Sequence, residues 1–462
     1  MADESPNGKW REVMLGDVVS ITHGWPFKSK FFSEDLSGKP IVVNIGNFQY
    51  TGGFRFESTT VKEYREDYPA EYDLKPRDIL LVMTCQTAGG EILGIPGRIP
   101  DDGRTYLHNQ RLGKVVVKEA DAVDPDFLYW LFLWSEFNRE LYVGATGTKI
   151  LHTAPKRIEA FKFKLPPIGE QRAIASILGA LDDKIELNRR MNATLESLAR
   201  AIFKSWFVDF DPVRSKSGQQ ANPPSGTGAA TATSPPPRDL SPDSSPAYSP
   251  FTLPPSLSAL FPSTFQDSDL GKIPTGWEVV RLGDFANNHD KLRQPVKGKD
   301  RVAGPYPYYG ASGVVDHVNE FIYDGEYLLV AEDGENLRTR NTPIAFRATG
   351  RFWVNNHAHV LSGDHDGVTR FLMFTLRATD ISGYLTGSTI PKLSQRSMNE
   401  ITFVKPSDEV FDAFGELVDG IFKRMDANEW ESSTLSTLRD TLLPKLLSGE
   451  LPVPAALTAH RK

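Results

Sequence analysis

Residues 174–206 read IASILGALDDKIELNRRMNATLESLARAIFKSW, and this stretch decides the fold. Alternate steps of four and three residues from Ile174 give a heptad seam that is apolar at both ends and polar in its middle. This pattern predicts a long helix that packs along a partner helix. The predicted seam residues in this helix are Ile174, Leu178, Leu181, Ile185, Asn188 and Leu195.

The same seam returns 240 residues later in the chain, at Phe414, Val418, Ile421, Met425, Asn428 and Leu435. Asn188 and Asn428 coincide, and a polar residue at a seam position fixes register and partner. We therefore expect the two helices to pack on each other, antiparallel, with their polar middles facing. About forty helical residues would extend about 60 Å. Pro444 is expected to end or kink the second helix near its last turns.

The segments in front of the two helices are also repeated. The motif Trp10…Leu15-Gly16-Asp17 returns as Trp277…Leu282-Gly283-Asp284, at an offset of 267 residues. Closer to the helices the offset is 240: Thr146-Gly147 matches Thr386-Gly387, and Ile150, Phe163 and Pro166 match Ile390, Phe403 and Pro406. The first copy is therefore 27 residues longer in its middle. The two halves share their ends and differ in their middles.

These patterns predict an α+β protein: two globular domains separated by two long antiparallel coiled-coil helices, with a pseudo-two-fold internal repeat. Residues 78–83 and 326–331 should form matching buried strands, and residues 127–133 and 371–376 matching short helices. The segment 211–272 holds 12 of the 33 prolines and should be a disordered tether. The predicted divisions are 1–165 (first head), 166–210 (first helix), 211–272 (tether), 273–405 (second head), 406–449 (second helix) and 450–462 (tail).

The composition limits the class of protein. The 462 residues carry a formal net charge of −7, which predicts weak DNA binding by the chain alone and dependence on partners. Cys85 is the only cysteine, so neither an intrachain disulfide nor a cysteine-based metal cluster is possible. The sequence lacks a run of 18 apolar residues and a signal-peptide pattern at its start, which favours a cytoplasmic protein.

Motifs for catalysis are weak. Asn222-Pro223-Pro224-Ser225 lacks the aromatic residue of an adenine methyltransferase loop and lies in the tether. A Gly-Lys-Ser/Thr phosphate loop does not occur in the sequence. His357 and His359 have no third ligand at a suitable spacing, so we expect no metal site. The stretch 332–335 follows a predicted strand and is either a plain turn or a contact with base edges.

Together these motifs resemble the specificity subunit of type I restriction–modification enzymes. Besides the Trp…Leu-Gly-Asp pair, the resemblance is carried by residues 165–172 (LPPIGEQR), 185–188 (IELN), 201–210 (AIFKSWFVDF), 308–313 (YYGASG) and 442–449 (LLPKLLSG). It covers almost the whole chain except the tether, which is longer than the architecture requires.

The resemblance implies a non-catalytic, DNA-binding subunit in which each head reads one half of a bipartite target. The helices would act as a ruler, spanning roughly 18 base pairs, and would dock methyltransferase subunits, two in number. Those partners would carry S-adenosylmethionine, and a motor–nuclease subunit would use ATP and Mg²⁺, so this chain should hold no cofactor. The alternatives are a duplicated scaffold that binds proteins only and a fused restriction enzyme with an unrecognised catalytic site.

Side chains that can read base edges are expected after the buried strands and in nearby turns, although each could instead be a structural turn residue. The candidates in the first head are Gln86, Thr87, His108, Gln110 and Arg111; those in the second head are Tyr309, Ser312, Glu332, Asn336, Arg338, Arg340 and His357. Candidates for contact with the methyltransferase lie at the end of the first helix: Phe203, Trp206, Phe207 and Phe210.

Overall fold

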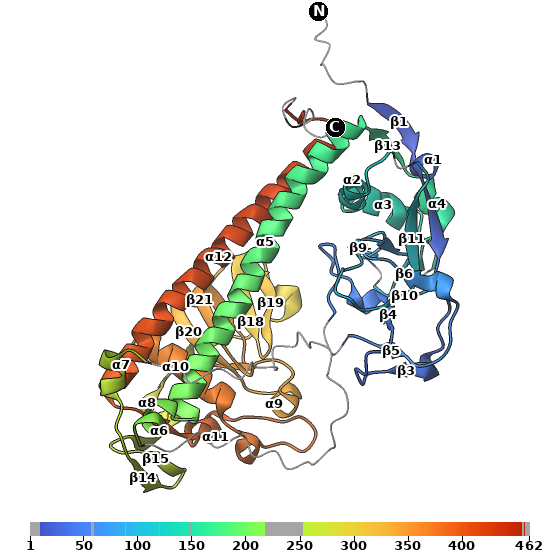
Figure 1. Ribbon diagram of the computed structural model, residues 1–462. Coiled ribbons are helices and arrows are strands. Elements are labelled where there is room, and N and C mark those ends of the chain that lie inside the picture. The colour runs from blue at the N-terminus through green and yellow to red at the C-terminus, as the bar shows by residue number, and fades with distance from the viewer. Residues whose placement is uncertain are drawn as a thin grey trace, which may run out of the picture. The chain divides into compact units, whose positions relative to one another are not determined.

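The computed structural model describes residues 10–56, 60–87, 89–119, 121–147, 149–217, 253–454 and 457. The chain forms two compact units, each built from parts that are distant in sequence. Unit 1 comprises Met1–Asn188 and Trp430–Lys462, and unit 2 comprises Arg189–Glu429. Both long helices pass from one unit into the other, and each unit therefore contains one head and a segment of both helices (Figure 1).

The first head, in unit 1, contains two main sheets made of short strands. The four-stranded sheet has the order β2 (Val19–His23), β11 (Leu112–Val117), β7 (Ile79–Val82), β9 (Pro96–Arg98). The five-stranded sheet has the order β3 (Phe32–Ser33), β5 (Glu63–Tyr64), β4 (Ile41–Val43), β10 (Tyr106–His108), β6 (Asp73–Leu74). Two small pairs complete the head: β1 (Arg11–Met14) with β13 (Lys162–Leu165), and β8 (Thr84–Cys85) with β12 (Leu151–His152).

The helices of the first head are short, and they cover the sheets because their apolar faces are buried. They are α1 (Leu15–Val18), α2 (Pro125–Phe132), α3 (Ser135–Val143) and α4 (Pro155–Glu159). Asp124 caps α2 by accepting bonds from the backbone N–H groups of Asp126 and Phe127. The predicted strand at 78–83 and the predicted helix at 127–133 correspond to β7 and α2.

The second head, in unit 2, is organised around one six-stranded sheet. Its order is β17 (Asn287–Asn288), β22 (Ala358–Ser362), β20 (Tyr323–Ala331), β21 (Ala345–Val354), β18 (Ala303–Gly310), β19 (Gly313–Val318). Two further pairs are β16 (Glu278–Arg281) with β23 (Thr402–Lys405), and β14 (Phe265–Ser268) with β15 (Gly271–Pro274). The helices are α7 (Pro255–Leu260), α8 (Leu282–Phe285), α9 (Asn336–Thr339), α10 (Asp366–Ala378) and α11 (Gln395–Asn399). The predicted strand at 326–331 and helix at 371–376 lie within β20 and α10.

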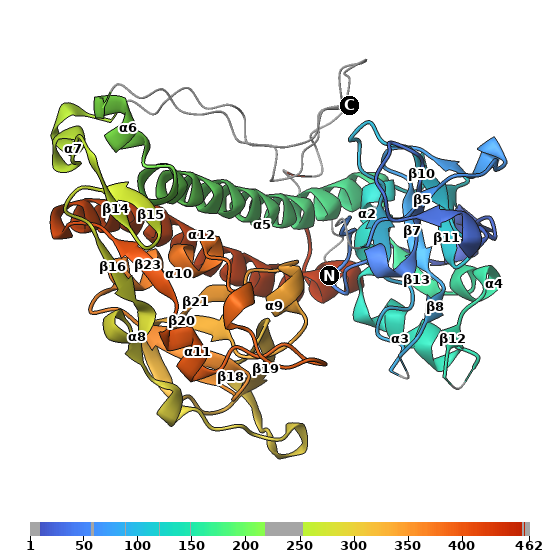
Figure 2. The same ribbon diagram turned by 90° about the horizontal axis from the view of Figure 1, so that it is seen from below.

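The two long helices are α5 (Ile168–Phe203) and α12 (Asp408–Ser448), which lie side by side in both ribbon views (Figures 1 and 2). In unit 1 the Asn188 amide donates to Glu431 Oε2 at 2.9 Å and to Ser432 Oγ at 3.3 Å. In unit 2 the Asn428 amide donates to Asn192 Oδ1 at 2.8 Å. Increasing residue numbers in α5 thus meet decreasing numbers in α12, so the expected antiparallel pairing with facing polar middles is confirmed.

The predicted seam residues, all of which are described, are buried or partly buried. Asn188–Ser432 and Asn192–Asn428 are equivalent contacts, because each residue is displaced by 240 from its counterpart. α5 and α12 have 36 and 41 residues, or about 54 Å and 62 Å of helix. Each of them thus has the length expected for a strut.

The repeated Leu-Gly-Asp motif has the same structural role in each head. The backbone N–H of Leu15 donates to Phe161 O, and that of Leu282 to Ile401 O, both at 2.8 Å. A Cβ on Gly16 would lie 3.0 Å from the Cβ of Glu159 in α4, and one on Gly283 would lie 2.6 Å from the Cβ of Asn399 in α11. Glycine is therefore required for α1 to approach α4 and for α8 to approach α11.

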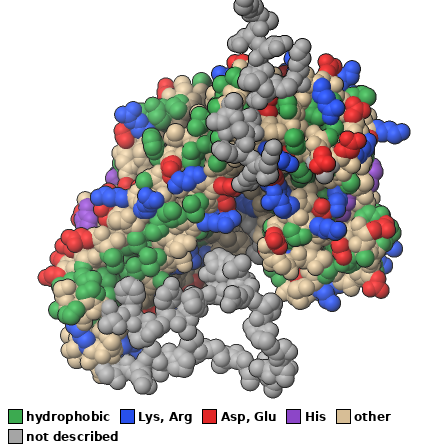
Figure 3. Space-filling model, turned by 45° about the horizontal axis from the view of Figure 1, so that its top comes forward, with side chains coloured by type: hydrophobic (Ala, Val, Ile, Leu, Met, Phe, Trp, Pro, Cys, Tyr) green, Lys and Arg blue, Asp and Glu red, His purple; other side chains and the backbone are tan. Residues whose placement is uncertain are grey.

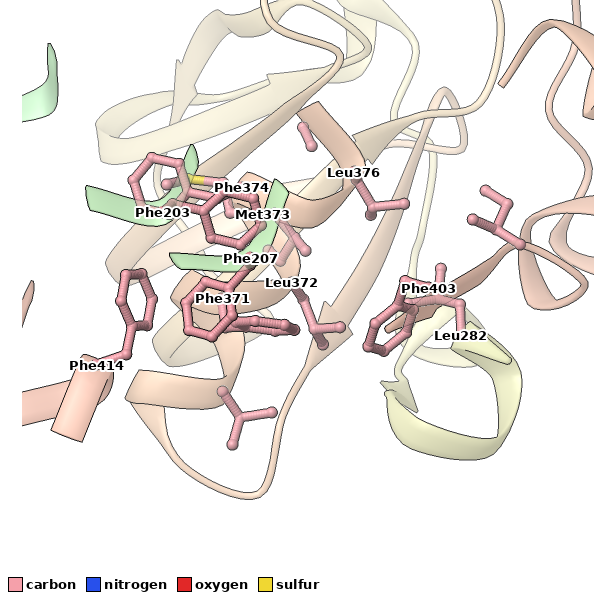
Figure 4. Packing of buried hydrophobic residues seen from close by; sticks show 14 of the residues in the cluster. Phe203, Phe207, Leu282, Phe371, Leu372, Met373, Phe374, Leu376, Phe403 and Phe414 are labelled. Carbon is pink, nitrogen blue, oxygen red and sulfur yellow. The ribbon is translucent and has the colours of Figure 1, made fainter. Parts of the chain in front are cut away.

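Each head completes its core with a helix end from the opposite half of the sequence. In unit 1, Leu446, Leu447 and Val453 belong to the same buried cluster as Leu15 and Phe127. In unit 2, the end of α5 enters the core of the second head, where Phe207 and Phe414 have ring centroids 5.0 Å apart (Figure 4). The two halves of the chain are thus interleaved rather than sequential.

The prediction of a disordered tether does not hold at the two ends of the segment 211–272, which are structured. Residues Asp211–Ser217 form α6, and α7, β14 and the first half of β15 follow from residue 255. Their apolar side chains hold them in place: Val213 and Phe261 are buried, and Trp206 and Phe261 have ring centroids 5.1 Å apart. The centre of the predicted tether, residues 218–252, lies outside the described residues.

Of the two outcomes expected at Pro444, an end or a kink, the helix does not end there, because α12 continues to Ser448, close to the predicted boundary at residue 449. Pro444 is exposed. Leu446 and Leu447, which follow it, are each only 2% exposed within the core of unit 1. Burial of these two side chains holds the last turn of the helix in place after the proline.

Candidate nucleic-acid interface

In the first head, two of the predicted readout segments lie next to each other at the end of the four-stranded sheet. β7 and β11 pair so that Leu112 lies opposite Val82, and the backbone N–H of Met83 donates to Arg111 O at 3.1 Å. This pairing places the turn at residues 109–111 beside the loop that follows β7. Gln86, Thr87, Gln110 and Arg111 are all exposed there.

His108 is also close to these residues, but it cannot contact DNA. Its side chain is buried in β10, and its Nε2 lies 2.9 Å from Leu112 O. Burial lowers its pKa to about 4, so the imidazole is neutral at physiological pH and Nε2–H donates to this carbonyl. The prediction that His108 reads DNA is therefore wrong, and the histidine is a structural residue of the sheet.

In the second head, backbone hydrogen bonds connect three predicted segments. Asn355 N donates to Tyr309 O at 3.0 Å, and Glu332 N donates to His357 O at 2.9 Å. The turn between β18 and β19, the turn before β22 and the loop after β20 therefore adjoin one another. Ser312, Arg338 and His357 are exposed there, and Tyr309, Asn336 and Arg340 are partly buried.

A buried ionic cluster lies behind this surface and involves Glu332. Its carboxylate accepts from Arg293 Nη1 at 2.7 Å and lies 3.1 Å from Lys392 Nζ. Burial alone would raise the pKa of Glu332, but the bond from Arg293 and the other neighbouring cations lower it overall. These contacts within the protein favour the interpretation of residues 332–335 as a turn, and a role of Glu332 in reading bases stays a prediction.

His357 and His359 contact different carboxylates around this cluster. The buried His359 contacts Asp290 at 2.6 Å and the carbonyl of Leu393 at 2.8 Å. Burial would raise the pKa of Asp290, but the contacts with His359 and Val360 N lower it overall, which keeps Asp290 ionised. His357 contacts Asp333 instead, at 2.8 Å. Among the described residues, no group of three or more His, Cys, Asp or Glu could hold a metal ion.

Asn336, Arg338 and Arg340 shape the loop after β20. Asn336 bridges this loop by exchanging two hydrogen bonds, both 2.9 Å, with the backbone of Thr342. Arg338 Nη2 donates to Gly387 O at 3.0 Å, and Arg340 Nη2 donates to Thr379 O at 2.8 Å. Asn336 is thus a turn residue. The two arginines keep further N–H groups that could meet an anion, since a guanidinium has five.

A pocket of about 390 Å³ lies beside these arginines, in unit 2. Arg338, Arg340 and Arg377 line it together with a single carboxylate, that of Asp380. Burial lowers the pKa values of Arg340 and Arg377, and the charge of Arg377 is paired, because its Nη1 donates to Glu196 at 2.6 Å. The charge and the size of the pocket suit a phosphate group.

The face drawn in Figure 3 is of mixed charge. On this face, Lys and Arg side chains are interspersed with Asp and Glu side chains. With the net charge of −7, this mixture means that attraction to DNA depends on local sites such as the arginine-lined pocket. A search of the described helices for long apolar stretches found none that could cross a membrane.

The aromatic residues predicted to contact a partner are buried within unit 2. Phe203, Trp206 and Phe207 are 4%, 2% and 7% exposed, and Phe210 packs against the same cluster. Phe207 and Phe210 have ring centroids 5.9 Å and 5.8 Å from that of Trp277 (the cluster is shown in part in Figure 4). The prediction of a partner surface here is therefore wrong, because the second head already covers the end of α5.

Sequence reasoning missed one feature of both heads, a loop that follows the repeated Thr-Gly pair. It comprises residues 146–152 and 386–392, and it carries the exposed side chains of Ile150 and Ile390. The repeat at an offset of 240 residues was the available signal, because it retains the threonine, the glycine and the isoleucine in heads that otherwise differ.

Comparison with known proteins gives this arrangement its family. The model of the type I restriction modification DNA specificity domain matches residues 7–197 and 274–412. The chain is 25% identical over 479 residues to the type I restriction enzyme HindI specificity subunit of Haemophilus influenzae, covering 96% of this chain and 99% of that protein. It is 24% identical over 367 residues to the MjaIX specificity subunit of Methanocaldococcus jannaschii, covering 75% of this chain and 73% of that protein.

The fold is also that of a solved specificity subunit. The crystal structure of the S subunit from the type I restriction-modification system of M. genitalium aligns with a TM-score of 0.52 at 16% identity, over 96% of this chain and 98% of that one. Two heads joined by long helices, with the family domain matched twice, define a DNA-recognition component rather than a catalytic one. The chain belongs to the type I restriction–modification DNA specificity family, as its sequence motifs indicated.

Proposed function

We propose that each head reads one half of a bipartite DNA target and that the paired helices set the distance between the halves. One observation carries this proposal: the two heads share their ends but have differently built middles, with sheets of four and five strands in one and of six in the other. Two different half-sites require heads whose central parts differ. The equivalent ends of the heads and the two long helices can then hold the half-sites at a fixed spacing.

The chemistry belongs to partners in this proposal. Two methyltransferase subunits would dock on the helices and bring S-adenosylmethionine, and a motor–nuclease subunit would bring ATP and Mg²⁺. The chain's own part is to place its readout residues in the groove and to keep the half-sites in register. The mixed surface charge supports dependence on partners for much of the phosphate attraction.

Selection from random-sequence DNA tests the proposal. The chain, purified with its methyltransferase partner, is mixed with duplexes of random sequence, and the bound duplexes are sequenced. We expect enrichment of a split motif, with two specified parts around an unspecified spacer of constant length. A scaffold that binds proteins only would enrich no motif, and this outcome would overturn the proposal.

Variants of the second head add a sharper test. Arg338→Ala combined with Arg340→Ala should relax only one of the two specified parts, because both arginines lie in one head. Lys272→Ala in β15, which removes an exposed ion pair with Asp267 of β14, is the matched control and should leave the motif unchanged. Relaxation of both parts, or of neither, would contradict the assignment of these arginines. The chain alone with DNA, Mg²⁺ and S-adenosylmethionine should neither cleave nor methylate.

A further inference from the structure

The loop that follows the repeated Thr-Gly pair has the same architecture in both heads; we name residues 146–152 and 386–392 the Thr-Gly loops. In the first, the backbone groups of Thr146 and His152 exchange hydrogen bonds of 2.9 Å and 2.8 Å. In the second, those of Thr386 and Lys392 exchange bonds of 2.8 Å and 2.7 Å. Each loop is thus closed at its base by the first and last of seven residues; residue 148 lies outside the described part of the chain.

Glycine is required at the second position of each loop. Gly147 and Gly387 have φ values of 106° and 88°, a region that other residues rarely adopt. A Cβ on Gly147 would lie 2.0 Å from Ile150 O, and one on Gly387 would lie 2.2 Å from Ile390 O. The chain therefore turns back on itself tightly, and both loops are built features rather than slack connections.

Each loop presents an isoleucine to solvent. Ile150 is 46% exposed and Ile390 is 62% exposed. Neither side chain contributes to a buried cluster of its head, although the residue after Ile150, Leu151, does. A large apolar side chain held on a tight, glycine-dependent turn in two otherwise dissimilar heads has no evident role in the packing of either head.

Both loops lie beside the predicted readout residues. In the first head, β12 pairs with β8, so that Leu151 lies opposite Cys85, the residue before Gln86. In the second head, Lys392 forms a bridge with Asp333, and Arg338 donates to Gly387 O at 3.0 Å. The isoleucines are therefore neighbours of the part of each head that differs between the halves.

The charges around the loops suit a polyanion. Lys149 and Arg111 are exposed in the first head, whereas Lys392 and Arg338 of the second head are about half-exposed and pair with Glu332 and Glu335. The arginine-lined pocket is continuous with the second loop, because Arg338 and Leu385 line it. The nearby carboxylates of Asp333 and Glu335 are paired with His357 and Arg338.

We propose that the Thr-Gly loops are sequence-independent DNA contacts, one in each head, in which Ile150 and Ile390 pack on the sugars of the groove wall while the adjacent cations meet phosphates. Two heads that read different half-sites can share only contacts with the parts of DNA that are the same in both half-sites, which are the sugars and phosphates. The inference rests on the proposed function. It adds that the Thr-Gly loops bind DNA irrespective of its sequence.

The test measures binding of two duplexes by the complex of the chain with its methyltransferase partner. One duplex carries the motif that the wild-type complex selects, and the other is a scrambled duplex of equal length. Burying the exposed half of one isoleucine should change affinity by about fivefold. Ile150→Ala with Ile390→Ala should therefore weaken binding of both duplexes by roughly 25-fold, leave their affinity ratio unchanged and leave the selected motif unchanged.

Two exposed leucines provide matched controls. Leu36 is 56% exposed in the first head and Leu270 is 47% exposed in the turn between β14 and β15. Leu36→Ala with Leu270→Ala removes a similar amount of exposed apolar surface outside the Thr-Gly loops and should leave both affinities unchanged. Ile150→Asp with Ile390→Asp should weaken binding further than the alanine pair, because a carboxylate next to phosphates is repelled.

Three outcomes would overturn the inference. Unchanged affinity for both duplexes would show that the isoleucines do not touch DNA. Weaker binding of the motif duplex alone would make them base-reading residues. Loss of the assembled complex on a sizing column, with the controls intact, would assign the loops to the methyltransferase instead. A wild-type complex that selects no motif is a different failure, that of the proposed function.

Discussion

His108 shows how a single buried side chain makes the stability of the first head depend on pH. Its ring is 3% exposed, and burial lowers its pKa from 6.5 to about 4. Between these two pH values the unfolded chain binds a proton that the folded chain does not. The contribution of His108 to the free energy of unfolding is therefore fully present above pH 6.5, and it is lost as the pH falls from 6.5 to 4.

We expect this loss to amount to roughly 3 kcal/mol for the pKa difference given. The measurement compares urea unfolding of the wild type and of His108→Gln at pH 7.5 and pH 4.5. Glutamine can still donate to Leu112 O but does not titrate in this range. The wild type should lose more stability than the variant on acidification; equal losses would show that His108 does not titrate on unfolding.

His108 also shows where sequence reasoning failed at the scale of single residues. The stretch His108-Asn109-Gln110-Arg111 is polar throughout, so the sequence alone did not distinguish the last residue of a strand from the turn that follows it. β10 is central in its sheet, with parallel β4 on one side and antiparallel β6 on the other, and this position buries His108. Gln110 and Arg111 are the second and third residues of the exposed turn, where readout remains a prediction.

At the scale of elements, a network of ion pairs fastens the second head to α12 within unit 2. Glu326 on β20 accepts from Arg370 of α10 at 2.8 Å and 2.9 Å, and from Arg347 of β21 at 3.1 Å. Arg370 also donates to Asp419 of α12 at 2.9 Å, and Arg347 donates to Asp426 of the same helix at 3.0 Å. Sheet, short helix and long helix are therefore joined through Glu326.

Glu326→Gln should destabilise unit 2 by about 2 kcal/mol, because two largely buried guanidinium groups lose a shared countercharge while glutamine keeps one acceptor. Hydrogen exchange should rise in β20, β21 and α10 and stay unchanged in the first head. The control is Asp324→Asn, on the same strand as Glu326, which weakens the exposed ion pair between Asp324 and Arg351 of β21. This variant should change neither the stability of unit 2 nor its hydrogen exchange. A uniform rise across both units would argue against a local role for the network.

Elements differed in how far the sequence predicted them. The long helices followed from a seam that repeats through more than four heptads, and β7, β20, α2 and α10 followed from their short apolar runs. The five-stranded sheet of the first head did not, because all of its strands have only two or three residues. Alternation of polar and apolar residues cannot be recognised over such lengths. Its pairing depends on contacts between residues far apart in the sequence.

At the scale of the whole molecule, the length of the helices should determine the length of the DNA spacer under the proposed function. Seven residues inserted in both helices, after Asn188 and after Glu429, preserve the heptad phase. They lengthen each helix by about 10 Å, or roughly three base pairs. Selection should return the same two half-site sequences with a spacer longer by about three base pairs.

The same seven residues inserted in α5 alone provide the control. They displace the seam of one helix relative to the other and break contacts such as that of Asn192 with Asn428, so the variant should unfold at a lower urea concentration. An unchanged spacer in the double insertion, with binding retained, would show that the helices do not act as the ruler.

The domain plan of the whole chain was predictable from its internal repeat, but the partner surface was not. The predicted site at the end of α5 treated an aromatic helix end as exposed. In the structure that end lies against Trp277 and Phe371 of the second head. Trp10 and Trp277 begin the two copies of the repeat at residues 10–17 and 277–284. Trp277 lies against the end of the first long helix, and Trp10 likewise lies against Gly449 at the end of the second, so the repeat indicated where the helix ends are covered.

The interleaved cores bear on how the chain is made. Leu446, Leu447 and Val453 are part of the core of the first head, although more than 280 residues separate them from the end of that head at residue 165. On the ribosome, the first head emerges early but cannot complete its core until the last residues are translated. At about 5–20 residues per second, this delay lasts on the order of 15–60 seconds. During this time the nascent first head exposes the apolar surface that α12 will cover, and a truncated product remains permanently in that state.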